Sequence, residues 1–360
     1  MLPIIYPKDV ALFNDDYLDA LTGTLPNSIN ATLAQVIRAD GSALTWQSLL
    51  VCPFEELEAL DVQLNLLSAA DKLLLEPLSN YTDQQPAIAA FFMDQHELTL
   101  ATCFYCNIDT IFTFSEIGDY KDGLDFIQRA NMHQLQLING IGPHKAGEIV
   151  KARTVDQFKS IDEFPVSVAI KDRIINFKRT ITHNHFTLDH FYHKSKFPFL
   201  SLCLYNFVPA CYACNAKLKG VGSLYVSNPH FSSPSAAAYQ FHKDVRFTIF
   251  YHKSQSIVTT LDDFSVDVSI VNNKPSHEQY LTQLKIRGRY FHYKKEALRL
   301  IELRKEYPDT KLVELAGETG MPVEVLKKMI FGEELFDTAF NQSSLTKYKR
   351  DIATNLDILQ

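Results

Sequence analysis

The chain has 360 residues, 46% hydrophobic and 21% charged, a composition typical of folded globular proteins rather than disordered ones. No apolar run reaches the roughly 18 residues of a membrane-spanning helix, and the start lacks a secretory signal pattern, so we expect a cytoplasmic protein that does not enter the membrane. Residues 1–100 contain 3 Lys and Arg against 14 Asp and Glu, and residues 101–360 contain 32 against 28, giving local charges of −11 and +4 within a total of −7. Either the acidic part binds a partner protein, or it is a solvated helical surface.

Residues 1–100 are predicted to be mostly helical. Apolar residues recur at helical spacing in "ATLAQVIRADGSALTWQSLLV" (31–51) and in "FEELEALDVQLNLLSAADKLLL" (54–75). No combination of residues with catalytic potential occurs in this region, so the candidate chemistry lies further along the chain.

Two Cys-x-x-Cys pairs, Cys103/Cys106 and Cys211/Cys214, account for four of the six cysteines. In a chain of this length such pairs indicate a metal site in a reducing compartment better than a disulfide framework. The first pair lies in "LATCFYCNIDTIFTF" (100–114), which alternates apolar and polar residues after the cysteines. We expect a small knuckle followed by a strand there.

A glycine-punctuated segment, "LQLINGIGPHKAGEIVKARTVDQFKSIDEF" (135–164), follows. Gly140 and Gly142 permit a tight hairpin with exposed N–H groups, and Pro143 suits the first turn of the next helix. Such groups can hold a phosphate, assisted by Lys145. The pattern resembles the helix-hairpin-helix module, which implies an insert at about residues 130–180 that binds the nucleic-acid backbone without reading sequence. A hairpin used only for packing is the alternative, because few basic residues surround it.

The segment "LDHFYHKSKFPFLSLCLYNFVPACYACNAKLKG" (188–220) combines several polar residues at a distinctive spacing. Asp189 and His190 end a strand-like run, a loop of about fifteen residues precedes Asn206, and Asn215 follows the second cysteine pair at a helix-compatible stretch. This pattern resembles the HNH nuclease family, whose fold is a ββα-metal finger. The resemblance implies that His190 is the general base, Asp189 and Asn215 bind a catalytic Mg²⁺ or Mn²⁺, and Asn206 holds the loop geometry.

The residue types suit that chemistry. Hydrolysis of a phosphodiester needs a base that titrates near neutral pH, which favours imidazole, and a divalent cation that neutralises charge on the phosphate. Carboxylate and amide oxygens are the ligands that Mg²⁺ prefers. Four lysines flank the site and either contact phosphates or are simply exposed, namely Lys194, Lys196, Lys217 and Lys219.

The resemblance also assigns a role to the cysteines. HNH domains often carry a structural zinc with one Cys-x-x-Cys before the Asp-His strand and one just before the helix, which here are Cys103, Cys106, Cys211 and Cys214. A closed four-cysteine site is structural rather than catalytic. The two pairs lie further apart than in a compact finger, so the zinc would tie the inserted module to the catalytic segment. Two unrelated pairs of free thiols are the alternative.

After about residue 224 the chain mixes strand-like runs, "RFTIFYHK" and "FSVDVSIV", with a helical tail that includes "RYFHYKKEALRLIELRKEY". The candidate segment, together with the tail "MIFGEELFDTAFNQSSLTKYKRDIATNL" (329–356), resembles the HNH nucleases that are paired with ABC-type or AAA-like ATPases in bacterial anti-phage systems of the Septu kind. That resemblance implies an ATPase partner and activation during infection.

We therefore expect an α+β protein with three regions. Residues 1–100 form an acidic, helical region for partner docking, residues 101–225 form a zinc-bound ββα-metal HNH finger containing the helix-hairpin-helix insert, and residues 226–360 are mixed and then helical. The expected function is metal-dependent endonucleolytic cleavage of nucleic acid, DNA above all. The alternatives are an RNA-directed nuclease and a nucleic-acid-binding or assembly subunit without cleavage.

Overall fold

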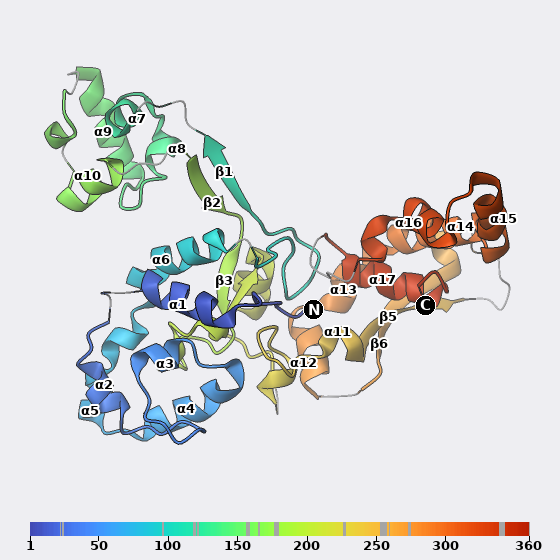
Figure 1. The fold of residues 1–360 in the computed structure, drawn as a ribbon, viewed down its shortest axis with the longest axis horizontal. Coiled ribbons are helices and arrows are strands. Elements are labelled where there is room, and N and C mark those ends of the chain that lie inside the picture. The colour runs from blue at the N-terminus through green and yellow to red at the C-terminus, as the bar shows by residue number, and fades with distance from the viewer. Residues whose placement is uncertain are drawn as a thin grey trace. The chain divides into compact units, whose positions relative to one another are not determined.

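The computed structural model describes residues 1–21, 23, 25–95, 97–117, 120, 122–155, 159–164, 166–175, 180–225, 228–252, 258, 260–272, 275–337 and 343–359. Helices and small antiparallel sheets are mixed along the chain, which is an α+β composition (Figure 1). The chain divides into two compact units, the first formed by Met1–Phe112 with His185–Gln360 and the second by Thr113–Asn184. Among the described helices, none has the length and apolar character needed to cross a lipid bilayer.

The N-terminal helices of the first unit are α1 (Val10–Ala20), α2 (Ile29–Leu33), α3 (Trp46–Leu50), α4 (Phe54–Leu66), α5 (Ala69–Leu74) and α6 (Tyr81–Asp94). The expected helical character is confirmed, with one correction between α2 and α3. There the chain turns back on itself, with Ile37 paired to Ala43, because Gly41 adopts a φ of 84° that a helix cannot contain. Asp40 stabilises the turn by accepting a hydrogen bond from the N–H of Ser42 at 2.9 Å.

These helices do not fold separately from the segment that follows the insert. The Tyr17 hydroxyl donates to the carbonyl of Leu202 at 2.6 Å, and the Ser201 hydroxyl donates to the carbonyl of Leu78 at 2.9 Å. Their apolar side chains belong to one hydrophobic core with those of residues 186–211 and of the C-terminal helices. Burial of this shared apolar surface makes the acidic region an integral part of the unit that carries the candidate site.

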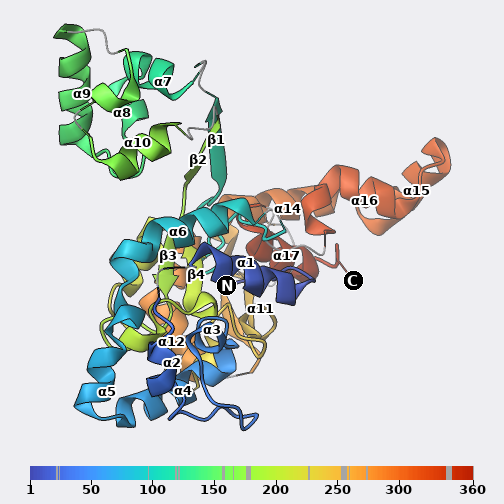
Figure 2. The same cartoon turned by 60° about the vertical axis from the view of Figure 1, so that its left-hand side comes forward.

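The second unit contains strands β1 (Thr113–Ile117) and β2 (Thr180–Asn184) and helices α7 (Gly123–Arg129), α8 (Met132–Leu135), α9 (Pro143–Val155) and α10 (Val168–Ile175). The strands are antiparallel, with Thr113 opposite Asn184. The helices cluster together in both views (Figures 1 and 2) and bury their own apolar core. The insert expected at about residues 130–180 lies within this unit.

After the insert, strands β3 (Thr187–His190) and β4 (Phe207–Ala210) form an antiparallel pair, followed by a π-helix at Ala213–Lys219. Strands β5 (Val245–Tyr251) and β6 (Phe264–Ile270) form another antiparallel pair. The remaining helices are α11 (Phe241–Asp244), α12 (Pro275–Gln283), α13 (Ile286–Phe291), α14 (Lys294–Glu306), α15 (Asp309–Thr319), α16 (Val323–Phe331) and α17 (Thr346–Asn355). Short 3₁₀ turns occur at Glu76–Ser79, Ile161–Glu163, Pro198–Leu200, Leu204–Asn206, Pro229–Phe231, Leu261–Asp263 and Glu333–Leu335.

Candidate functional site

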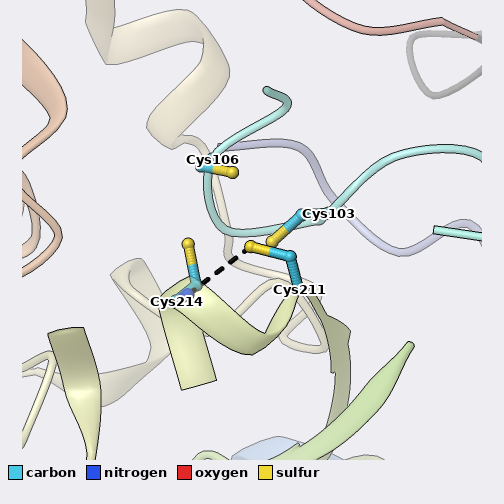
Figure 3. Close-up of side chains that lie close together, drawn as sticks. All are labelled: Cys103, Cys106, Cys211 and Cys214. Carbon is cyan, nitrogen blue, oxygen red and sulfur yellow. Dashed lines mark hydrogen bonds between the residues drawn. The ribbon is translucent and has the colours of Figure 1, made fainter. Parts of the chain in front are cut away.

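Four buried cysteines from two distant segments converge on one point, as Figure 3 shows. Their Sγ atoms all lie within 4.8 Å of one another, and the cysteines are Cys103, Cys106, Cys211 and Cys214. A tetrahedral zinc with Zn–S bonds of about 2.3 Å would hold sulfurs about 3.8 Å apart, so the cluster fits such an ion. The structure thus supports the expected four-cysteine metal site, and its spacing is compatible with zinc.

Backbone groups orient the sulfurs of this cysteine cluster. The N–H of Ile108 donates to Cys106 Sγ and the N–H of Cys214 donates to Cys211 Sγ, both at 3.4 Å. Asn107 sits at the tip of the first knuckle with a φ of 52°, which asparagine tolerates better than most residues. These turns direct the sulfurs to a common centre.

Arg289 in α13 is a member of the site that the sequence did not reveal. Its guanidinium donates to Cys214 Sγ at 3.1 Å, to Cys106 Sγ at 3.4 Å and to Asp109 Oδ2 at 3.0 Å. Burial alone would raise the pKa of the Cys106 thiol, but hydrogen bonds from the other cysteines and the Arg289 charge lower it well below its usual value. Arg289 therefore offsets negative charge that four thiolates would concentrate around a divalent ion.

Asn206 fastens the loop between β3 and β4. Its Oδ1 accepts from the N–H of Tyr192 at 2.8 Å, and its Nδ2 donates to the carbonyls of Tyr192 at 3.1 Å and Leu200 at 3.0 Å. The residue is fully buried, so every polar atom of its amide is used within the protein. This geometry is that of a residue that holds the loop, which is the role the HNH resemblance implies.

His190 ends β3 and lies inside the protein with 6% of its surface exposed. Its Nε2 lies 2.8 Å from the Ser201 carbonyl, and because a carbonyl only accepts, Nε2 carries the proton and Nδ1 the lone pair. The Tyr81 ring packs edge-on against the imidazole, with ring centres 4.5 Å apart. Burial lowers the pKa of His190 to about 4, and the nearby lysines Lys194 and Lys219 also lower it. The imidazole is therefore neutral and oriented, but covered.

Asp189 and Lys219 form a buried ion pair. Lys219 Nζ lies 3.0 Å from Asp189 Oδ1 and also donates to the His190 carbonyl at 2.8 Å, while the Tyr105 hydroxyl donates to Asp189 Oδ2 at 2.6 Å. Lys219 ends the π-helix, in which the Gly220 N–H reaches the carbonyl of Asn215 at 2.8 Å instead of the one four residues back, and Lys219 is buried. The expectation that Lys219 contacts phosphates is therefore wrong, because its side chain is enclosed.

The same pair bears on the expected magnesium site. Both carboxylate oxygens of Asp189 accept from donors of the protein, and burial raises the pKa of Asp189 in spite of the Lys219 charge. Asn215 lies on the π-helix directly after Cys214 and is half-buried. In this arrangement Asp189 does not fit a Mg²⁺ ligand, because a lysine ammonium occupies the place beside its oxygen.

The other flanking lysines lie at the surface. Lys194 places its ammonium 4.7 Å from the centre of the Tyr81 ring, on the residue that covers His190. Lys217 lies 5.9 Å from the centre of the Tyr212 ring, and Lys196 is exposed. These three cations remain available to a phosphate.

The glycine hairpin of the second unit connects α8 to α9. Gly140 has a φ of 95°, and Lys145 Nζ donates to its carbonyl at 3.2 Å. Gly142 precedes α9 and its carbonyl accepts from the N–H of Ala146 at 2.9 Å, while a side chain added at Gly142 would meet open space. The turn thus has the exposed helix start expected of a hairpin that binds phosphate.

Comparison of the chain with protein-family models, curated proteins and solved structures gave no match.

We expect purified protein to contain about one zinc per chain, measured by mass spectrometry of the metal. Cys214→Ser should remove most of the zinc and lower the midpoint of thermal unfolding, because three sulfurs hold the ion less well than four. Cys52→Ser is the matched control, since Cys52 is buried outside the cluster and its replacement should leave the zinc content unchanged. A well-folded wild-type protein without metal would contradict this expectation.

Lys219→Met should destabilise the fold by about 3–5 kcal/mol at pH 7, because it leaves the buried Asp189 carboxylate without its cation. The loss should shrink as the pH is lowered, since the unpaired carboxyl has a raised pKa and is stabilised by protonation. Urea unfolding at pH 5 and pH 7 measures both effects, and Lys217→Met on the same helix is the exposed control. Equal free energies of unfolding in the two variants would show that the Asp189–Lys219 ion pair does not stabilise the fold.

Proposed function

We propose that this protein is an endonuclease of the HNH type that hydrolyses phosphodiester bonds in nucleic acid, with DNA as its substrate. The observation that carries the proposal is the order and placement of residues around β3, β4 and the π-helix. His190 ends the first strand with an oriented imidazole, Asn206 fastens the following loop, and a four-cysteine cluster joins that segment to residues 103–106. This combination supports the resemblance that the sequence motif indicates.

The proposed base is Nδ1 of His190. It would take a proton from a water molecule whose oxygen forms a bond to phosphorus while the bond from phosphorus to the leaving 3′ oxygen breaks, and that oxygen takes a proton from solvent water. Nε2 keeps its hydrogen bond to the Ser201 carbonyl and so fixes the ring. A pKa of about 4 belongs to the covered ring, and access of water would move it back towards the usual value near 6.5. Cleavage by this route therefore requires displacement of Tyr81 from the imidazole.

The buried imidazole agrees with a nuclease that is inactive until a partner protein exposes His190 to water. We propose, from the resemblance, that the partner is an ABC-type or AAA-like ATPase and that the protein is an effector of a bacterial anti-phage system in the cytoplasm. The exposed carboxylates of α1, which include Asp15, Asp16 and Asp19, offer the partner a negatively charged surface. Such a surface would favour a basic patch on the ATPase.

A second candidate function is a nucleic-acid-binding or assembly subunit that does not cleave. The observation in its favour is that Asp189 is paired with Lys219 rather than open to a metal. The exposed Lys194, Lys196 and Lys217 would serve binding of DNA or RNA equally well without any chemistry.

Cleavage assays separate the two functions. Supercoiled plasmid, single-stranded DNA and structured RNA are incubated with the wild type and His190→Ala, in Mg²⁺, Mn²⁺ or chelator. The wild type alone should cleave DNA slowly or not at all, because Tyr81 covers His190, and the cleavage that it does show should fall by about 10²–10⁴-fold in His190→Ala, because the base is removed. His193→Ala is the matched control, since His193 lies at the loop surface, and its activity should be retained.

If the wild type does not cleave, the Tyr81→Ala variant still tests the proposed nuclease activity. Tyr81 and Phe207 both pack on the imidazole, so removing the Tyr81 ring opens one side of His190. The variant should cleave more than the wild type and lose that activity when combined with His190→Ala. Absence of cleavage in the wild type and in Tyr81→Ala, with both proteins folded and zinc-loaded, would overturn the nuclease proposal in favour of binding alone.

Gly142→Asp tests the hairpin of the second unit. The new side chain meets open space and suits the position before a helix, so the fold should be retained, while its charge should repel a phosphate and weaken DNA binding several-fold. Fluorescence anisotropy with labelled duplex DNA measures the affinity. Val168→Asp adds the same charge at the exposed start of α10 and is the control. Unchanged affinity in Gly142→Asp would leave the hairpin with a packing role.

A further inference from the structure

A cavity of about 420 Å³ lies in the C-terminal part of the first unit, between α11, β5 and α17. None of its lining residues belongs to the candidate nuclease site. Four of them are lysines or arginines, and these are Lys243, Arg246, Lys347 and Arg350. Asp351 supplies the one carboxylate among the lining residues that the structure describes. The lining residues therefore carry a formal excess of three positive charges, part of which the neighbouring Asp337 offsets at Arg350.

The Asp351 carboxylate already accepts hydrogen bonds from other groups of the protein. Asp351 Oδ2 accepts from the N–H of Phe247 in β5 at 2.9 Å and from Lys347 Nζ at 2.6 Å. Asn355, one turn later, accepts from the N–H of Ile249 at 3.1 Å. Asp351 thus joins α17 to β5, and its carboxylate accepts both from the N–H of Phe247 and from the ammonium group of Lys347.

The positive charges that line the cavity act on one another. Lys347 is buried with 2% of its surface exposed, and burial lowers its pKa, while Asp351 raises it and the charges of Arg246 and Arg350 lower it further. Like charges that lie close together repel one another, and a bound anion is the most direct way to offset that repulsion.

The cavity walls are held in place before any ligand arrives. The N–H of Lys347 donates to Asn107 Oδ1 at 2.9 Å, and the N–H of Leu345 donates to the Asn107 carbonyl at 2.6 Å. The start of α17 is therefore fixed to the first cysteine knuckle, and its other face to β5. Such preorganisation reduces the ordering cost of binding.

We propose that this cavity binds the phosphate groups of a nucleotide, either free or at the end of a nucleic-acid strand. Its volume lies in the range of protein ligand sites. Guanidinium and ammonium groups together are a common phosphate-binding set, the arginines by paired hydrogen bonds and the lysines as point charges. A phosphate chain concentrates two to four negative charges within this volume, whereas an acidic peptide spreads one charge per residue along an extended groove. The proposal does not depend on nuclease activity.

Calorimetric titration of the full-length, zinc-loaded protein tests this site. The probes are ATP, ADP, AMP, pyrophosphate and adenosine, and a short DNA strand with either a 5′-phosphate or a 5′-hydroxyl. We expect saturable binding that strengthens with the number of phosphates, weakens with added salt and is absent for adenosine. A preference for free nucleotides, or for the 5′-phosphorylated strand over its hydroxyl form, identifies the source of the phosphate.

Arg246→Gln and Lys243→Gln remove exposed cations, so these variants should fold as the wild type does. Each should weaken binding roughly tenfold, which corresponds to the loss of one charge-assisted contact. Lys328→Gln on α16 is the matched control, because Lys328 is exposed but does not line the cavity, and its affinity should equal that of the wild type. No saturable binding of any phosphate probe to the wild type, or equal affinity in all three variants, would overturn the proposal.

Discussion

The arrangement of the first unit depends on the convergence of its four buried cysteines. They join residues 103–106 to residues 211–214 across the whole inserted unit, so their contact closes a very long loop. Three other elements attach to the same centre. Arg289 of α13 donates to two of the sulfurs, Tyr105 reaches from the first knuckle to Asp189, and Asn107 holds the start of α17. A metal ion at this centre would thus stabilise the candidate site and the C-terminal cavity together.

A second constraint is that the candidate site shares its core with the N-terminal helices. Tyr81, at the start of α6, covers His190, and the 3₁₀ turn that precedes it supplies the carbonyl of Leu78 to Ser201. The residue that orients the imidazole is therefore itself fixed by the acidic region. Any movement that opened the imidazole to water would disturb apolar contacts in that region, which links access to the site with the part of the chain whose charge favours a partner.

Local patterns in the sequence predicted the local features of this protein. Cys-x-x-Cys spacing identified the cysteine cluster, and the strand-like run that ends in Asp189 and His190 identified the strand that carries His190. The burial of Lys219 was not predictable, because it depends on a contact with Asp189, which lies 30 residues away in the chain and belongs to another element. Arg289 was missed because it lies 75 residues beyond Cys214 and belongs to no motif. The cavity was missed for the same reason, since its cations come from segments a hundred residues apart in the chain.

The positions of the buried cations change how the net positive charge of residues 101–360 should be interpreted. The positive excess of residues 101–360 suggested a basic working surface, but part of that charge is internal. Lys219 neutralises a buried carboxylate, Lys347 lies inside the C-terminal cavity, and Arg289 faces thiols. Fewer cations therefore remain on the surface for non-specific contact with a nucleic-acid backbone than the count implies. Binding must rely more on a few well-placed groups, and the glycine hairpin, the exposed lysines near His190 and the C-terminal cavity each offer such groups.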